Sequence, residues 1–76
     1  MTKQIKIEEL IPLMKKGWIA CNKDGSWYWY SAKPKLEILY GFWDFYVGNL
    51  KNLSTIFNIA PAKDWKNSLI KVGGKQ

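Results

Sequence analysis

The segment Trp18–Ser31 restricts the fold more than any other part of the chain, because its pattern is typical of a β-hairpin with apolar or aromatic residues on both faces. Alternate residues of a strand point to opposite faces of a sheet. Residues Asn22–Gly25 fit a type I turn with Gly25 in the left-handed conformation, which pairs Cys21 with Trp27. A two-residue Asp-Gly turn would shift the partner strand by one residue, and the sequence leaves both turns open.

Either turn separates the aromatic residues of the second strand into two pairs. Trp27 and Trp29 share one face, and Tyr28 and Tyr30 share the other. Because tryptophan points inward more often, we expect both tryptophans in the core and both tyrosines at least partly accessible. The tyrosine face must then pack against a helix, a second chain or a ligand.

A short helix is predicted before the hairpin, over residues 7–16. Its apolar positions follow the i, i+3, i+4, i+7 spacing of one helical face and are Ile7, Leu10, Ile11 and Met14. Pro12 fits such a helix only near its first turn or at a kink, and Gly17 suits its end.

A third strand is predicted after the hairpin. Lys33-Pro-Lys35 ends the second strand, because proline cannot donate a hydrogen bond to a neighbouring strand. Residues 36–44 alternate in the manner of a strand. Gly41 permits a bend or bulge within it, and residues 42–47 are expected to continue extended.

The carboxy-terminal third predicts one more strand and a turn of helix. Gly48-Asn49 is typical of a turn, and residues 55–59 are a candidate fourth strand. Asp64 can cap a short helix over residues 65–70. Residues 72–76 are expected to form a frayed tail.

These elements predict a single small α+β domain over residues 1–76. A short N-terminal helix packs on an antiparallel sheet of three or four strands, and a short C-terminal helical turn closes the domain. Five Trp, four Tyr and three Phe supply large apolar surfaces for so short a chain. The residues expected in the core are Leu10, Ile11, Met14, Trp27, Trp29, Trp43, Trp65 and Leu69.

The residue types argue against catalysis. The chain has no histidine, which removes the usual general base and the commonest metal ligand. The single cysteine, Cys21, lies within a predicted strand and is expected to be a buried structural thiol. A turn, a strand end and a helix cap account for Asp24, Asp44 and Asp64. We therefore expect no enzyme activity, no cofactor and no metal site.

The amino-terminal residues 1–6 lack the apolar run of a signal peptide, and no apolar stretch approaches the length of a membrane span. We accordingly expect a cytoplasmic protein without a membrane partner. The formal net charge is +6, and every basic residue is a lysine. Lysine attracts anions diffusely, whereas bidentate recognition of phosphates or guanine favours arginine. The lysines can equally reflect the codon usage of an AT-rich genome.

The remaining candidate site combines aromatic rings with lysines. Tyr28 and Tyr30, flanked by Lys23, Lys33 and Lys35, could stack bases and attract phosphates, as a nucleotide ligand requires. Alternatively, the tyrosines pack beneath other aromatic residues and the lysines only keep the surface soluble. A third interpretation is a face for self-association.

Residues 17–34, with a tryptophan, an acidic-residue-and-glycine turn, an aromatic strand and a Lys-Pro exit, resemble a hairpin that recurs in small bacteriophage and prophage accessory proteins. The segment Asp64-Trp-Lys-Asn-Ser-Leu69 is similar to the carboxy-terminal signature of the same group. Cys21-Asn22 stands where such chains often have an apolar residue and an aspartate. The resemblance implies the cytoplasm of an infected or lysogenic bacterium.

The resemblance also implies that the chain acts by binding. The first hypothesis is sequestration of a nucleotide-type anion, in a counter-defence role, within a pocket at a subunit boundary of a homo-oligomer. A domain of this size seldom holds a ligand cavity alone. The second hypothesis is a protein–protein inhibitor or adaptor that presents the outer face of the sheet to a host protein.

Overall fold

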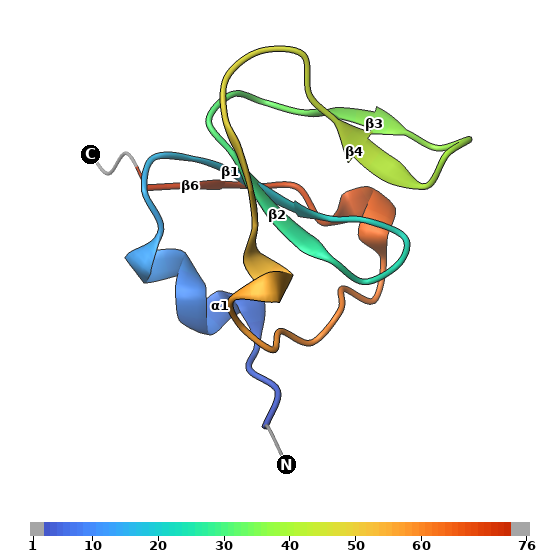
Figure 1. Cartoon of the computed structure of the whole chain (residues 1–76). Helices are drawn as coiled ribbons and strands as arrows, with labels where there is room; N and C mark the ends of the chain where they lie inside the picture. Colours follow the sequence, from blue (N-terminus) through green and yellow to red (C-terminus); the bar gives the residue numbers. More distant parts are fainter. Residues whose placement is uncertain (1–2, 74–76) are drawn as a thin grey trace.

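A central antiparallel ribbon of two strands, β1 (Gly17–Cys21) and β2 (Trp27–Tyr30), organises the computed structural model, which describes residues 3–73 (Figure 1). Strands β5 (Leu50–Asn52) and β6 (Ile70–Val72) extend this ribbon to a four-stranded sheet in the order β5-β2-β1-β6. Strands β3 (Lys35–Glu37) and β4 (Phe42–Asp44) form a separate two-stranded sheet. The chain is a small α+β fold, as the sequence predicts.

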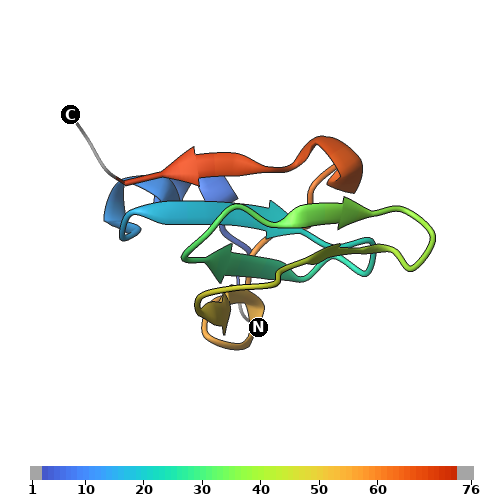
Figure 2. The ribbon, with the colours of Figure 1, turned by 90° about the horizontal axis from the view of Figure 1, so that it is seen from above.

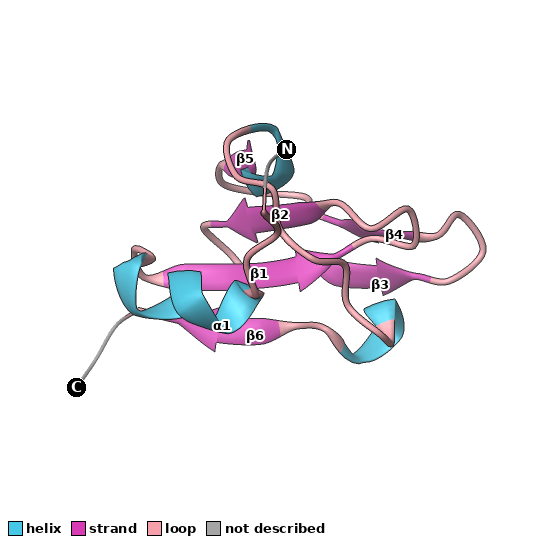
Figure 3. Cartoon of the chain, turned by 90° about the horizontal axis from the view of Figure 1, so that it is seen from below, coloured by secondary structure: helices cyan, strands magenta, loops and turns pink. Residues whose placement is uncertain are grey.

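Within residues 3–73, four short helical segments accompany the strands. They are α1 (Ile7–Leu10) and the 3-10 helices η1 (Ile11–Leu13), η2 (Leu53–Thr55) and η3 (Trp65–Asn67). Helix α1 lies against the face of the sheet formed by β1 and β6, whereas the β3–β4 hairpin lies over the opposite face (Figures 2 and 3). The four-stranded sheet is therefore the middle layer of the molecule.

The turn of the central ribbon confirms the type I register. Cys21 lies opposite Trp27, and Gly25 has a φ of 93°. The backbone N–H of Asn22 donates to the carbonyl of Ser26 at 2.9 Å, which closes the turn. Gly25 thus adopts the left-handed conformation that the bulge requires.

Each face of the ribbon has its own core. The cluster on the α1 side, which we call the inner cluster, contains Ile7, Leu10, Ile19, Cys21, Trp27, Leu53, Ile59 and Val72. The cluster on the β3–β4 side, the outer cluster, buries Ala20, Tyr30 and Trp43. Of the residues expected in the core, Leu10, Trp27 and Trp43 are buried, and the others pack partly buried against one of the two clusters. The sequence reasoning missed Ile19, Leu53, Ile59 and Val72.

A helix forms where the sequence predicts one, but it is shorter than residues 7–16. The α-helix ends at Leu10 and continues as η1, and Met14 has an extended ψ of 145°. Pro12 is the physical reason, because its ring clashes with the carbonyl four residues earlier and it has no N–H to donate. The tighter 3-10 geometry of η1 accommodates the proline near its start.

The predicted strand over residues 36–44 is wrong, because the chain reverses within it. Glu37 lies opposite Phe42, so the intervening residues 38–41 form the loop of a hairpin. Gly41 adopts a φ of 76°, and its N–H donates to the carbonyl of Glu37 at 3.0 Å. The glycine that suggested a bulge therefore closes a turn.

The fourth strand lies earlier than residues 55–59. Strand β5 pairs with β2, and Asn52 then redirects the chain, because its side-chain Oδ1 accepts a hydrogen bond from the Ser54 N–H at 3.0 Å. Within the predicted segment, only Ile59 makes a β-bridge, in parallel with Ile5.

The C-terminal prediction is partly wrong. The helical turn η3 ends at Asn67, and Ile70–Val72 pairs with β1 as strand β6. Val72 is 2% exposed and therefore does not belong to a frayed tail, whereas residues 74–76 lie outside the described residues. Asp64 precedes η3 as predicted, but its carboxylate accepts from the Asn67 side chain at 2.6 Å and makes no cap bond to the backbone.

Candidate binding surfaces

Tyr30 lies beneath the β3–β4 hairpin and is 1% exposed. Its hydroxyl donates a hydrogen bond to the carbonyl of Trp43 at 3.2 Å, and burial raises the pKa of the phenol well above its ordinary value. The expectation that Tyr30 is accessible is therefore wrong. The hairpin folds back over this face of the ribbon, which the prediction of a continuous third strand did not allow.

Tyr28 is half-buried, in agreement with the prediction that it is partly accessible. Its hydroxyl accepts a hydrogen bond from the side-chain amide of Asn52 at 3.3 Å. Its ring centroid lies 6.4 Å from that of Tyr30, which in turn lies 6.1 Å from that of Phe45. The tyrosines thus belong to a packed aromatic cluster, which agrees with the interpretation that they pack beneath other rings.

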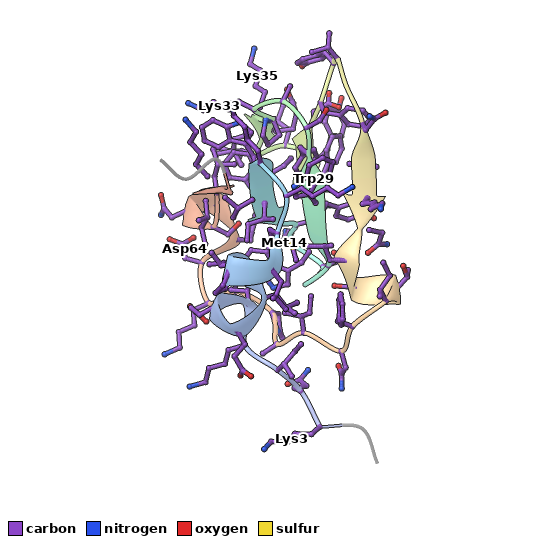
Figure 4. The ribbon with its side chains drawn as sticks, turned by 90° about the vertical axis from the view of Figure 1, so that its left-hand side faces the viewer. Lys3, Met14, Trp29, Lys33, Lys35 and Asp64 are labelled. Atoms are coloured by element: carbon purple, nitrogen blue, oxygen red, sulfur yellow. The ribbon has the colours of Figure 1, made fainter. Side chains whose placement is uncertain are left out.

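The three predicted lysines contact different neighbours. The aliphatic part of Lys23, in the turn of the ribbon, lies beside Gly41 of the β3–β4 loop. The Lys33 ammonium lies 5.5 Å from the ring centroid of Trp18. Lys35 lies opposite Asp44 in the register of β3 with β4. Figure 4 shows Lys33 and Lys35 at the same end of the molecule. They do not surround an open face of Tyr28 and Tyr30.

Trp18 is the centre of a basic surface that the sequence reasoning missed. The Lys71 ammonium lies 5.8 Å from its ring centroid, and Lys33 contributes the second cation. Strand pairing sets Lys71 directly opposite Trp18. The sequence signal was weak, because Lys71 lies in a segment where a helix end and a tail were expected.

The loop of the β3–β4 hairpin carries three consecutive exposed apolar residues, and one of them, Leu39, is the most exposed large apolar residue of the described chain. We call Ile38, Leu39 and Tyr40, which are 62%, 91% and 73% exposed, the hairpin tip. The Tyr40 ring stacks on that of Phe42 with centroids 6.0 Å apart. Figures 1 and 2 show the tip beyond the end of β1. Gly41 is the residue that could have indicated this loop, because glycine also suits a turn.

The hairpin is attached firmly to the central ribbon despite its exposed tip. The Asn22 side-chain oxygen accepts a hydrogen bond from the Trp43 N–H at 2.8 Å, and the Lys23 N–H donates to the Gly41 carbonyl at 3.0 Å. Trp43 also donates from its indole N–H to the carbonyl of Trp65 at 3.1 Å. Strand β4 and Gly41, the last residue of the loop, are thus held by the body of the domain.

The thiol of Cys21 belongs to the inner cluster. Cys21 is fully buried, and burial raises the pKa of its thiol, so the less reactive protonated form is favoured. Among residues 3–73, no cluster of three or more histidine, cysteine or acidic side chains could hold a metal ion. Over the same range, no helix has the length and apolar character needed to cross a membrane.

Comparison with known proteins adds no relative. The chain matches no family model, no curated protein and no solved structure. The likeness to phage and prophage accessory proteins therefore remains a prediction from the residues quoted above.

Proposed function

We propose that this chain is a non-catalytic protein-binding module that presents the hairpin tip to a protein partner. The observation that carries the proposal is the exposure of Ile38, Leu39 and Tyr40 on a hairpin whose base is anchored. Contiguous exposed apolar residues on a small domain are typical of interaction sites, and aromatic residues are enriched in interfaces. This use of the surface corresponds to the inhibitor or adaptor hypothesis, moved from the covered sheet face to the hairpin.

The anchored base of the hairpin supports the proposal energetically. Association costs less conformational entropy when the binding segment is already ordered. The Trp43 N–H donates to Asn22 of the ribbon, and the Lys23 N–H of the ribbon donates to Gly41 of the hairpin. These two hydrogen bonds order the hairpin before a partner binds.

The resemblance to phage proteins completes the proposal. In that setting the partner is a host protein in the cytoplasm of an infected or lysogenic bacterium, and blocking it would serve counter-defence. No reaction is part of the proposal.

The test introduces a charge into the apolar surface of the hairpin tip. Leu39→Asp places a carboxylate in the centre of the tip, whereas the control Leu13→Asp changes another highly exposed leucine, on η1. We expect a host protein captured from bacterial lysate and then reconstituted from purified components to bind wild type and Leu13→Asp, with at least tenfold loss for Leu39→Asp. Equal binding by Leu39→Asp, or no protein partner in the lysate, contradicts the proposal.

A second candidate function, sequestration of a nucleotide-type anion, is favoured by the two lysines that flank Trp18. Their ammonium groups would attract phosphates, and the indole offers a ring for base stacking. Native mass spectrometry with cyclic and linear nucleotides tests this candidate and reads the oligomeric state in the same spectra. Bound nucleotide that is lost in Trp18→Leu supports it, and an unliganded protein at saturating nucleotide contradicts it.

A further inference from the structure

An apolar groove of about 620 Å³ lies between η1 and the segment formed by β5 and η2. Its apolar lining includes Leu13, Met14, Trp29, Leu50, Ile56 and Phe57. Figure 4 labels two of these residues, Met14 and Trp29, which come from different segments of the chain. The groove shares no lining residue with the hairpin tip or with the surface around Trp18.

Trp29 occupies a fixed position in this groove. It packs partly buried against the inner cluster, and its indole N–H donates to the carbonyl of Lys15 at 3.2 Å. Strand pairing places Lys51 directly opposite Trp29. Residues opposite each other in an antiparallel pair point to the same face of the sheet. The backbone of Lys15 and the strand partner Lys51 therefore both adjoin Trp29, and both lysines line the groove.

The charged residues that line the groove are all basic. Lys15 and Lys51 are the charged residues of its lining, and no carboxylate lines it among the described residues. Leu13, on the same wall as Lys15, is 77% exposed, so the apolar surface is open to a ligand. The combination is complementary to a ligand with an apolar body and an anionic end.

We propose that this groove binds an amphiphilic carboxylate, with its hydrocarbon part on Trp29 and its carboxylate near the ammonium groups of Lys15 and Lys51. The volume lies within the range of roughly 300–1,000 Å³ that is typical of small-ligand sites. A protein segment ordinarily needs a larger surface than a groove of this size provides. The site is independent of the protein partner proposed for the hairpin tip.

A series of straight-chain carboxylates tests the proposal. Hexanoate, octanoate and decanoate, each below its micelle concentration, are titrated into the ¹⁵N-labelled protein while amide and indole resonances are recorded. We expect the Trp29 indole and the Leu13 amide to shift, and the affinity to rise by up to roughly fourfold per added methylene. Decyltrimethylammonium, of opposite charge, should bind at least tenfold more weakly than decanoate.

Two pairs of variants locate the ligand. Leu13→Asp should lower decanoate affinity at least tenfold, whereas Leu39→Asp at the hairpin tip should leave it unchanged. Lys51→Gln should weaken decanoate severalfold without weakening decanol, and Lys71→Gln, beside Trp18, is its matched control.

Three outcomes overturn the proposal. The first is equal affinity for decanoate and the cationic amphiphile, and the second is decanoate binding that survives Leu13→Asp. The third is concentration-dependent dimerisation of the unliganded protein that Leu13→Asp abolishes, because the groove is then covered by a second copy of the chain. Since the hairpin-tip proposal uses Leu39→Asp and a protein partner, either proposal can fail while the other holds.

Discussion

The two faces of the central ribbon are covered by different chemistry. The inner cluster is mainly aliphatic and gathers segments from both ends of the chain, including Ile7 and Val72. The outer cluster buries only Ala20, Tyr30 and Trp43 and surrounds them with partly exposed rings. The same strands thus support a dry core on one side and an aromatic layer with an accessible rim on the other.

Strand pairing separates the two faces, whereas side-chain hydrogen bonding does not, because the Trp27 indole of the inner cluster also donates to a backbone carbonyl, that of Ala60, at 2.9 Å. In the outer cluster, the Tyr30 hydroxyl donates to the Trp43 carbonyl and the Trp43 indole donates to the Trp65 carbonyl. In addition, β3 and β4 pair with each other and with no strand of the four-stranded sheet. The comparison teaches that the inner cluster holds the sheet together, whereas the outer cluster attaches a hairpin that can present its tip without disturbing the sheet.

The largest expected effect comes from truncating one tryptophan in each cluster. Trp27→Ala should lower the free energy of unfolding by about 3–5 kcal/mol and leave a domain of this size largely unfolded. Trp43→Ala removes a side chain of similar size, but its cost should be smaller, because the hairpin can detach while the four-stranded sheet persists. Urea unfolding measures both costs.

Native-state amide hydrogen exchange shows where each truncation acts. In Trp43→Ala, we expect lost protection in β3 and β4 and retained protection in β1 and β2. A cooperative loss across all strands in that variant would show that the two clusters form a single unit, and the distinction between them would be abandoned.

The sequence predicted what local chemistry decides. The type I turn at Gly25, one of the two turns that the sequence left open, sets Cys21 opposite Trp27, and Pro12 indicated a short or kinked helix. The reversal at Gly41 was missed because Ile38, Leu39 and Tyr40 favour strands and hide a loop. A prediction of one continuous strand over this hairpin leaves no element of the chain to pack over the face of Tyr28 and Tyr30.

The binding site predicted from the sequence was partly wrong because it depended on those missed contacts. Tyr30 was expected at the surface because its cover, the β3–β4 hairpin, is a tertiary feature with no signal in the strand pattern itself. Trp18 lay within the recognised hairpin, but Lys71 reaches it only through the pairing of β6 with β1. Edge strands as short as β5 and β6 are set by what they pair with and not by their own propensity.

The second prediction uses one titrating group from each face. Burial raises the pKa of Cys21 in the inner cluster and of Tyr30 in the outer cluster above their ordinary values of 9.0 and 10.0. The unfolded chain releases these protons at lower pH than the folded chain does. The contribution of these two protonated groups to the free energy of unfolding is therefore fully present below about pH 9, and it is lost as the pH rises above that value.

The slope reaches at most about 1.4 kcal/mol per pH unit for each group. Between pH 8 and pH 10.5 we expect a loss of about 1–2 kcal/mol, measured as the free energy of unfolding in urea. Cys21→Ala should remove most of the decline that begins near pH 9, and Tyr30→Phe the part above pH 10. A wild-type stability that stays constant to pH 10.5 contradicts the burial of both groups.

The smallest effect concerns the joint between the two faces. Asn22 belongs to the turn of the ribbon, and its side-chain oxygen accepts from the Trp43 N–H of β4 at 2.8 Å. Asn22→Ala leaves that N–H without its partner and should cost about 1 kcal/mol, because a net hydrogen bond is worth roughly that much. Exchange of the Trp43 amide should accelerate more than exchange of the Ile19 amide.

Asn22→Asp is the matched control, since an aspartate at this position keeps an acceptor for the Trp43 N–H. It should retain most of the stability and the protection of that amide. If Asn22→Ala accelerates exchange at Ile19 as much as at Trp43, the joint carries stability for the whole sheet, and the outer hairpin is part of the core and not a separately attached layer. If only β3 and β4 respond, the hairpin is an attached binding element whose strength can be tuned at one side chain.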